Sequence, residues 1–260
     1  MPQLSVNGRK LGYEIQPMSF DKSKLTVVFI HGTGGDRNDW RGQLDGLSCA
    51  ANMLALELPG HGASEPPGES SVSEYSRWVV EFINALGLAK VMVVGCSLGS
   101  AITQWIALNA AESWLVAVGL VGAGARLKVH PAFLQGLRED SVKALTALAD
   151  FCLGDRPDPI LQKNLRAKLA DSSPELIYGD LYACNEFDVM DKVNTISLPT
   201  CLIVGEQDKL TPVKYSKYLN EVIKGSVLNV IPNAGHLVSM EQPEQFNKSL
   251  GDFLESLSVR

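Results

Sequence analysis

The sequence predicts an α/β protein with a mostly parallel sheet, helices on both faces, an N-terminal antiparallel hairpin and a helical lid insertion. Short apolar runs alternate with amphipathic segments, which is typical of a parallel sheet covered on both sides. Asn7-Gly8 separates two alternating segments, and this dipeptide favours a hairpin because it tolerates positive φ. Residues 127–197 break the alternation, since they contain helical patterns and no buried-strand pattern.

The strands expected after the hairpin are short apolar runs at 25–30, 53–58, 91–94, 116–121, 201–204 and 227–231. We interpret these runs as buried strands. Helical spacing of apolar residues predicts helices at 71–86, 98–111, 212–222 and 242–257. The first of these helices begins at Ser71, which forms a capping-box pattern with Glu74, and it ends before Gly87.

The length and composition indicate one large globular domain with an insertion. The chain has 260 residues, of which 45% are apolar and 20% charged, and this composition argues against extended disorder. We expect residues 1–126 and 198–260 to form the core. Residues 127–197 are then the helical lid, placed over the carboxyl edge of the sheet, where open α/β sheets bind ligands.

Charge and cysteine usage exclude several classes of partner. The chain has 23 Lys and Arg against 29 Asp and Glu, a net charge of −6. It contains no basic cluster that would predict a surface for binding nucleic acid or an anionic membrane. No apolar run is long enough to span a bilayer. The N-terminus has no secretory pattern, and the five cysteines, including Cys49, are scattered without C-x-x-C spacing. We therefore expect a cytoplasmic protein.

The segment Gly95-Cys96-Ser97-Leu98-Gly99 runs from a predicted buried strand into a predicted helix. A Gly-x-Ser-x-Gly turn of this kind lifts the serine hydroxyl above the sheet, because both glycines lack side chains that would clash. The first N–H groups of the helix then face the same space. Ser97 is therefore the predicted nucleophile.

A serine hydroxyl needs a base to take its proton, and the chain has only four histidines. His31 and His61 lie in glycine-rich loops, where we expect structural roles. His130 lies at the start of the expected lid, where we expect it to be exposed to solvent. His236 follows the last predicted strand and precedes a helix, which puts it at the same sheet edge as the serine. His236 is the predicted base.

The imidazole in turn needs a carboxylate that fixes its tautomer and stabilises its charged form. Two carboxylates follow the strand at 201–204, namely Glu206 and Asp208. We favour Asp208, which lies deeper in the turn and closer to the helix that Pro212 starts, and we expect Glu206 to face solvent or support the loop.

Acyl transfer also needs N–H donors for the oxyanion that develops on the substrate. The N–H of Leu98, directly after the nucleophile, is one candidate. The N–H of Thr33 is the other, since the loop His31-Gly32-Thr33-Gly34-Gly35 follows a buried strand at the same edge.

With these residues assembled, the chain resembles the α/β-hydrolase superfamily along essentially its full length. It is most similar to the lid-bearing esterase, enol-lactonase and cofactor-free haloperoxidase branch. Ser100 and Cys96 depart from the residues common in that branch, and neither belongs to the predicted triad. The resemblance implies the nucleophile–acid–base order Ser97, Asp208, His236 and neither a metal nor an organic cofactor. It rests on His31-Gly32-Thr33-Gly34, Leu58-Pro59-Gly60-His61-Gly62-Ala63-Ser64, Gly95-Cys96-Ser97-Leu98-Gly99, the segment 204–212, and Gly235-His236 with Glu241-Gln242-Pro243, and the segment 180–188 resembles the last lid helix of such relatives.

The leading hypothesis is a serine hydrolase that cleaves a small carboxylic ester or lactone through an acyl-enzyme intermediate. The same triad also serves C–C bond hydrolysis and perhydrolysis, and a ligand receptor that retains a hydrolase pocket is a third alternative. A homodimer is left open as the quaternary state. Some apolar lid residues are candidate pocket walls, but we expect packing between lid helices as their main role and assign none to binding: Phe133, Leu134, Leu148, Phe151, Leu176 and Phe187.

Overall fold

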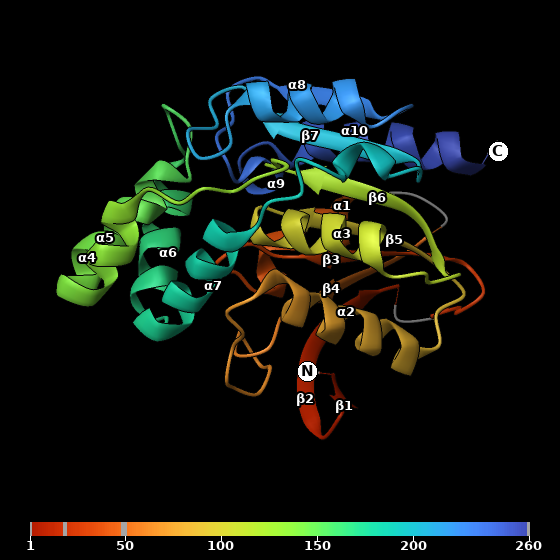
Figure 1. Ribbon diagram of the computed structural model, residues 1–260, viewed down its shortest axis with the longest axis horizontal. Helices are drawn as coiled ribbons and strands as arrows, with labels where there is room; N and C mark the ends of the chain where they lie inside the picture. The colour runs from red at the N-terminus through yellow and green to blue at the C-terminus, as the bar shows by residue number, and fades with distance from the viewer. Residues whose placement is uncertain (1, 18–19, 48–50, 259–260) are drawn as a thin grey trace.

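The computed structural model describes residues 2–17, 20–47 and 51–258, and an eight-stranded sheet forms its centre (Figure 1). The spatial order is β1-β2-β4-β3-β5-β6-β7-β8. Strands β3 to β8 pair in parallel, and β1 and β2 pair antiparallel as a hairpin beside β4. This confirms the predicted fold class. The strands are β1 (Gln3–Val6), β2 (Arg9–Gln16), β3 (Leu25–Ile30), β4 (Asn52–Leu56), β5 (Lys90–Cys96), β6 (Leu115–Val121), β7 (Thr200–Gly205) and β8 (Val227–Ile231).

Helices cover both faces of this sheet. Helices α2, α3 and α8 contribute to the cluster of buried residues on one face, and α1, α9 and α10 contribute to the cluster on the other. The core helices are α1 (Arg41–Gly46), α2 (Val72–Leu86), α3 (Leu98–Asn109), α8 (Val213–Val222), α9 (Val238–Glu241) and α10 (Pro243–Ser258), and the short 3-10 helices are η1 (Arg37–Trp40) and η2 (Val193–Thr195).

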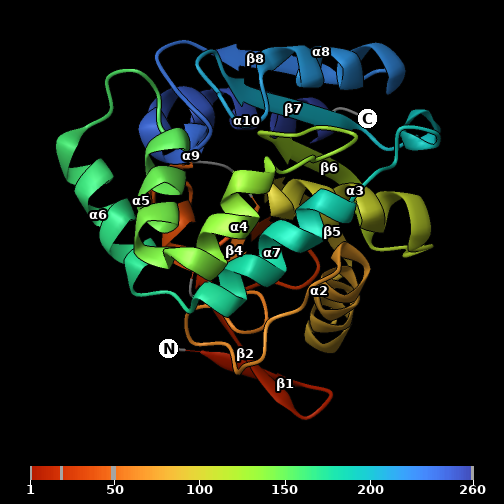
Figure 2. The ribbon, with the colours of Figure 1, turned by 60° about the vertical axis from the view of Figure 1, so that its left-hand side comes forward.

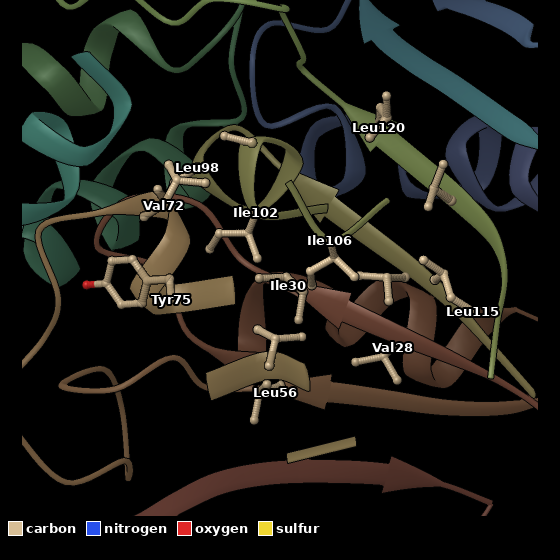
Figure 3. Close-up of a cluster of buried hydrophobic side chains, with 14 of the residues drawn as sticks. Val28, Ile30, Leu56, Val72, Tyr75, Leu98, Ile102, Ile106, Leu115 and Leu120 are labelled. Atoms are coloured by element: carbon tan, nitrogen blue, oxygen red, sulfur yellow. The ribbon is translucent and has the colours of Figure 1, made fainter. Parts of the chain in front are cut away.

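Alternation along β3 shows why the apolar runs form this sheet. Val28 and Ile30 pack into the cluster beneath α2 and α3, and Val27 and Phe29 pack into the opposite cluster. All four side chains are fully buried, as expected for a strand with helices on both sides. Figure 3 shows the first cluster, in which Ile30 lies below Ile102 of α3.

Two local predictions are wrong. The run at 227–231 is not buried on both faces, because β8 is the edge strand of the sheet and leaves Val227 and Val230 exposed. Ser71 is the N-terminal cap of α2 by position, but its side chain makes no capping bond and its hydroxyl instead pairs with that of Ser73 at 2.6 Å. The predicted end of α2 is right, since Gly87 adopts the left-handed conformation with φ 66°.

Four further helices lie between β6 and β7 in the chain and gather beyond one end of the sheet (Figures 1 and 2). They share a cluster of buried residues of their own, which includes Leu145, Leu165 and Ile177. We call them the cap helices: α4 (Pro131–Glu139), α5 (Ser141–Phe151), α6 (Pro159–Ala170) and α7 (Pro174–Glu186). Within the described ranges, no helix combines the length and apolarity that crossing a membrane requires. Cys49 lies outside the described residues.

Candidate active site

The turn between β5 and α3 holds Ser97 in a strained backbone conformation. Ser97 has φ 55° and ψ −114°, a region that residues with side chains rarely adopt. Glycines make the turn possible, because a Cβ at Gly95 would overlap the carbonyl of Gly99 and a Cβ at Gly99 would overlap that of Ile30. The serine therefore stands at the carboxyl end of β5, beside the first turn of α3.

His236 and Asp208, on the loops after β8 and β7, form a buried pair. His236 Nδ1 donates to Asp208 Oδ2 at 2.8 Å, and the two residues are only 2% and 5% exposed. The Thr211 hydroxyl also donates to Oδ2, at 2.7 Å, and the backbone N–H groups of Leu210 and Thr211 donate to Oδ1. Because Nδ1 carries the proton in this pair, Nε2 is the basic nitrogen of the neutral ring.

The pair shifts the pKa values of both its members. Burial alone would lower the pKa of His236, but the negative charge and hydrogen bond of Asp208 outweigh burial and raise it. Burial alone would raise the pKa of Asp208, but the charge of His236 and the bonds from Thr211 outweigh it and lower it. His236 Nε2 is buried without a hydrogen-bond partner among the described residues. The ring is thus arranged to hold a proton on Nε2 once one arrives.

Backbone contacts bring Ser97 and His236 together across the end of β6. The N–H of Ser97 donates to the carbonyl of Val121 at 3.0 Å. The next residue, Gly122, touches the imidazole, since a Cβ there would lie 3.0 Å from His236 Nδ1 and Cε1. The Cys96 thiol lies 3.9 Å from the His236 carbonyl oxygen. Ser97 and His236 both line one cavity, and within the described part of the chain the serine hydroxyl makes no hydrogen bond to the imidazole.

The loop after β3 carries Thr33 beside the elbow. A Cβ at Gly32 would lie 3.2 Å from Ser97 Cβ, so the absence of a side chain allows the close approach. The backbone N–H groups of Thr33 and Leu98 donate to no acceptor within the described chain. The two predicted oxyanion donors therefore flank the serine with their hydrogens unused.

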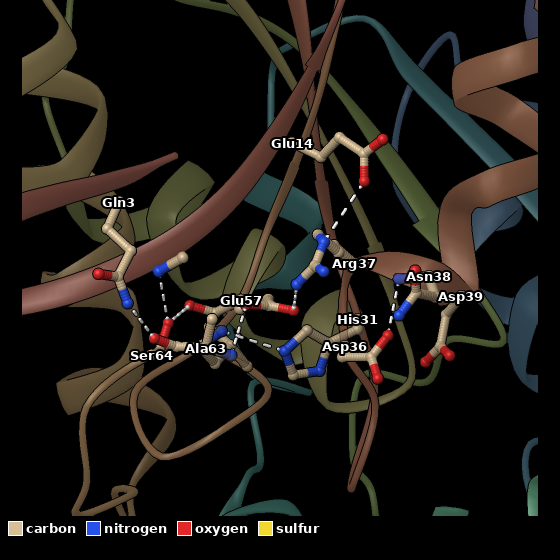
Figure 4. A network of polar contacts seen from close by, with 12 residues as sticks. Gln3, Glu14, His31, Asp36, Arg37, Asn38, Asp39, Glu57, Ala63 and Ser64 are labelled. Carbon is tan, nitrogen blue, oxygen red and sulfur yellow. Dashed lines mark hydrogen bonds and ion pairs between the residues drawn. The ribbon is translucent and has the colours of Figure 1, made fainter. Parts of the chain in front are cut away.

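A polar network stabilises the neighbouring loops. Figure 4 shows Arg37 between the carboxylates of Glu14 and Glu57, and Glu57 also accepts from the N–H of Ala63 at 2.7 Å. Glu57 is fully buried, so its charge is balanced by the guanidinium rather than by water. This network ties β2 to the loops after β3 and β4.

The other histidines and the alternative carboxylate lie as the sequence predicted. The His31 ring is buried and bonds the Gly32 carbonyl and the N–H of Leu58, which fits a structural role. His61 bonds the Pro59 carbonyl and the carboxylate of Asp180. His130 and Glu206 are both exposed.

A cavity of about 830 Å³ lies between the sheet edge and the cap helices. This volume is within the usual range for small-molecule sites. Ser97, His236 and Thr33 line its floor, and apolar cap side chains line much of the rest, including Phe133, Leu148, Phe151, Leu165, Leu169 and Leu181. Three of the six candidate walls named from the sequence are thus lining residues, whereas Leu134 and Phe187 pack into buried clusters.

Sequence reasoning missed several residues that shape the site. Thr211 anchors Asp208, and Gly122 abuts the imidazole. Glu241 accepts from the N–H of Gly235 at 2.9 Å and from that of Gly154 at 2.8 Å, joining the loop of the histidine to the segment after α5. Thr211 and Glu241 lie in two of the motifs that carry the resemblance, which was the available signal for them.

Comparison with known proteins agrees with this architecture. A model of the alpha/beta hydrolase family matches residues 27–249. The chain is 25% identical to 3-oxoadipate enol-lactonase 1 of Acinetobacter baylyi, over 89% of each chain. It is 24% identical to the pimeloyl-[acyl-carrier protein] methyl ester esterase of Neisseria meningitidis, over 88% of this chain and 92% of that one.

Solved structures agree as well. A thermophilic esterase superposes with a TM-score of 0.87 at 31% identity, covering 98% of this chain and 97% of its own. The enol-lactonase of Burkholderia xenovorans superposes with a TM-score of 0.89 at 23% identity, covering 98% and 100%, and at that identity it bears on the fold alone. Fold and site define a hydrolytic enzyme built on a strand–serine–helix elbow. The chain belongs to the alpha/beta hydrolase family, in its esterase and lactonase branch.

Proposed function

We propose that the protein hydrolyses a small carboxylic ester or lactone through an acyl-enzyme intermediate on Ser97. The observation that carries the proposal is the strained elbow of Ser97 beside a His236 ring whose Nδ1 is bonded to Asp208 and whose Nε2 is unpartnered. This combination matches the roles of nucleophile, base and orienting acid.

In the first half of the reaction, Ser97 Oγ attacks the carbonyl carbon while its proton passes to His236 Nε2. This step requires rotation of the serine hydroxyl toward the imidazole, because the two groups are not hydrogen-bonded in the structure. Catalytic hydrogen bonds of this kind often form only when substrate is bound. The N–H groups of Thr33 and Leu98 stabilise the oxyanion. Asp208 stabilises the imidazolium, which then gives its proton to the departing alkoxide.

In the second half, water attacks the acyl-enzyme carbonyl and gives a proton to the same nitrogen of His236. Collapse of the second tetrahedral intermediate returns that proton to Ser97 and releases the carboxylic acid. A lactone differs only in that the alcohol remains tethered to the acid. Every residue in this scheme comes from one chain, so the proposal requires no second copy.

Replacing Ser97 by alanine tests the nucleophile. We expect Ser97→Ala to lower kcat on a p-nitrophenyl ester by about 10⁵-fold, as with other triad nucleophiles. A fluorophosphonate should label the wild type but not this variant. Ser76→Ala is a control for the loss of a serine hydroxyl elsewhere in the core, because Ser76 is buried on α2 and does not line the cavity. Turnover of Ser97→Ala within about tenfold of the wild type contradicts the assignment.

A substrate panel tests the reaction class. The apolar cap lining favours an uncharged acyl group of modest size in the cavity. We therefore expect multiple turnovers on short p-nitrophenyl esters or lactones and slower reaction with β-diketones. A single burst that leaves Ser97 permanently occupied contradicts the proposal and favours a receptor.

A further inference from the structure

The last cap helix, α7, carries a fully buried carboxylate that the proposed reaction does not use. Asp180 is 0% exposed and accepts hydrogen bonds from three separate segments of the core. Its Oδ2 accepts from the backbone N–H of Gly34 and from His61 Nε2, each at 3.0 Å, and its Oδ1 accepts from the Tyr75 hydroxyl at 2.7 Å. Burying a carboxylate costs free energy, and only an arrangement that supplies all these donors compensates for that cost.

His61 supplies the opposite charge for this carboxylate. Its Nδ1 faces the Pro59 carbonyl at 3.0 Å and its Nε2 faces Asp180. Both partners are acceptors, so the ring donates from both nitrogens and is an imidazolium. Burial alone would lower the pKa of His61, but the charge of Asp180 and the hydrogen bonds to Asp180 and Pro59 together outweigh burial and raise it. The pair therefore holds α7 on the core by charge as well as by shape.

Gly34, which donates to Asp180, is directly covered by the cap. It has φ +62°, and a Cβ there would lie 2.6 Å from Ile177 Cδ1 and 2.7 Å from Leu169 Cδ2. Lys168, on α6, adds ion pairs to Asp36 at 3.1 Å and to Asp39 at 2.5 Å in the following turn. The loop after β3 is thus supported from above by two cap helices.

The support acts on both peptide units that flank Thr33. The Gly32 carbonyl accepts from His31 Nδ1 at 2.8 Å and from the N–H of Gly35 at 3.0 Å. In a planar trans peptide the N–H points away from the carbonyl, so these bonds aim the Thr33 N–H toward the cavity. The next peptide unit is fixed by the bond from the Gly34 N–H to Asp180.

We propose that Asp180 is a positioning residue for the oxyanion hole: by binding the Gly34 N–H, it makes the aim of the Thr33 N–H depend on α7 being seated on the core. The inference rests on the proposed function, because it assumes that Thr33 serves the oxyanion. It predicts a loss mainly in the transition state, since Asp180 itself does not line the cavity that holds the substrate.

The test compares Asp180→Ala with Asp150→Ala. Asp150 is a cap carboxylate that also accepts three side-chain bonds, from Arg166 Nε and Nη2 and from Gln162, all inside the cap. We express kcat per site titrated by the fluorophosphonate. We expect Asp180→Ala to lower kcat by about 10- to 100-fold and to keep KM within about threefold of the wild type. This loss of kcat is smaller than the loss that follows complete removal of an oxyanion donor. Asp150→Ala should match the wild type in both.

A second readout separates positioning from stability. Phenylboronic acid forms a tetrahedral adduct on the serine that places an oxygen in the oxyanion site, so its inhibition constant should rise in parallel with the loss of kcat. A purely structural role would lower the unfolding temperature of Asp180→Ala and leave both values unchanged in the folded fraction. That result overturns the inference.

The conservative variant Asp180→Asn keeps the test decisive if the alanine variant does not fold. An amide keeps the volume and one acceptor oxygen of the aspartate but removes the charge that matches His61. We therefore expect the kcat of Asp180→Asn to be lower than that of the wild type by about threefold or more, and higher than that of Asp180→Ala. A kcat closer to the wild type than that overturns the inference. If Ser97→Ala stays active, the proposed function fails first; if it is inactive while the Asp180 variants keep full kcat, only this inference fails.

Discussion

The molecule contains two buried histidine–carboxylate pairs, and only one of them has the geometry that the proposed reaction requires. His236 and Asp208 are joined at 2.8 Å, and His61 and Asp180 at 3.0 Å. All four residues are at most 5% exposed. In both pairs the carboxylate raises the pKa of the imidazole against the effect of burial. By distance and burial the pairs are nearly equivalent.

They differ at the second ring nitrogen. His61 Nδ1 is bonded to the Pro59 carbonyl, so neither nitrogen of His61 can receive a proton from substrate. His236 Nε2 has no partner among the described residues, and His236 lines the cavity together with Ser97. A strongly paired and shifted histidine is therefore not by itself a catalytic one. The vacant nitrogen at the cavity makes the difference.

Replacing each histidine by alanine should give the largest difference between the two pairs. We expect His236→Ala to lower kcat by about 10⁵-fold, because it removes the base of the proposed relay. His61→Ala should keep kcat within about tenfold while lowering the free energy of unfolding by about 3–5 kcal/mol, because Asp180 loses its counter-charge. Esterase kinetics and urea denaturation measure the two effects. Equal losses of kcat would contradict the division of roles.

The carboxylates should differ in the same way, with a smaller effect on rate. Asp208→Asn should lower kcat by about 10⁴-fold, because an amide no longer fixes the tautomer or stabilises the imidazolium. Glu206→Gln is the matched control, since Glu206 lies on the same loop and is exposed. If the two variants lose kcat equally, Asp208 is not the orienting acid.

The sequence could predict that the three residues of the proposed relay lie at one sheet edge, because each of them follows a strand. Ser97, Asp208 and His236 come after β5, β7 and β8, and parallel strands bring such loops to one edge regardless of the distance along the chain. The edge position of β8 could not be predicted in this way. Its apolar run resembles a buried strand, and only the order of the strands in space leaves it exposed.

The second pair was out of reach for a different physical reason. Asp180 lies on the face of α7 that also carries Ile177 and Cys184, both buried, and a carboxylate within an apolar face is the available signal. Its partners His61 and Gly34 lie 119 and 146 residues earlier in the chain. The spacing of residues along one helix contains no information about which loops it will cover.

Gly122 offers a way to perturb one pair and not the other. A Cβ at this position would lie 3.0 Å from two atoms of the His236 ring, and the residue has φ +52°. We expect Gly122→Ala to lower kcat by about tenfold, because the displaced imidazole meets the serine less well. Gly225→Ala is the control: it has φ +75° with nothing within 4 Å, so it shares the backbone strain without the contact. Equal kcat in both variants would show that the ring tolerates the shift.

The pH dependence of kcat/KM gives the finest distinction. His236 must be neutral to accept the serine proton, and its pKa is raised above the ordinary value of 6.5. Activity should therefore fall as the pH drops through that raised pKa, with the midpoint of the acid limb above 6.5. In Asp208→Asn the main charge that raises the pKa is gone, so the residual activity should extend to lower pH. His61→Gln should leave the midpoint where it is, although the pKa of His61 is raised as well, because that ring does not line the cavity. If the midpoint shifts in His61→Gln and not in Asp208→Asn, the titrating group belongs to the His61–Asp180 pair, and the roles proposed for the two pairs are wrong.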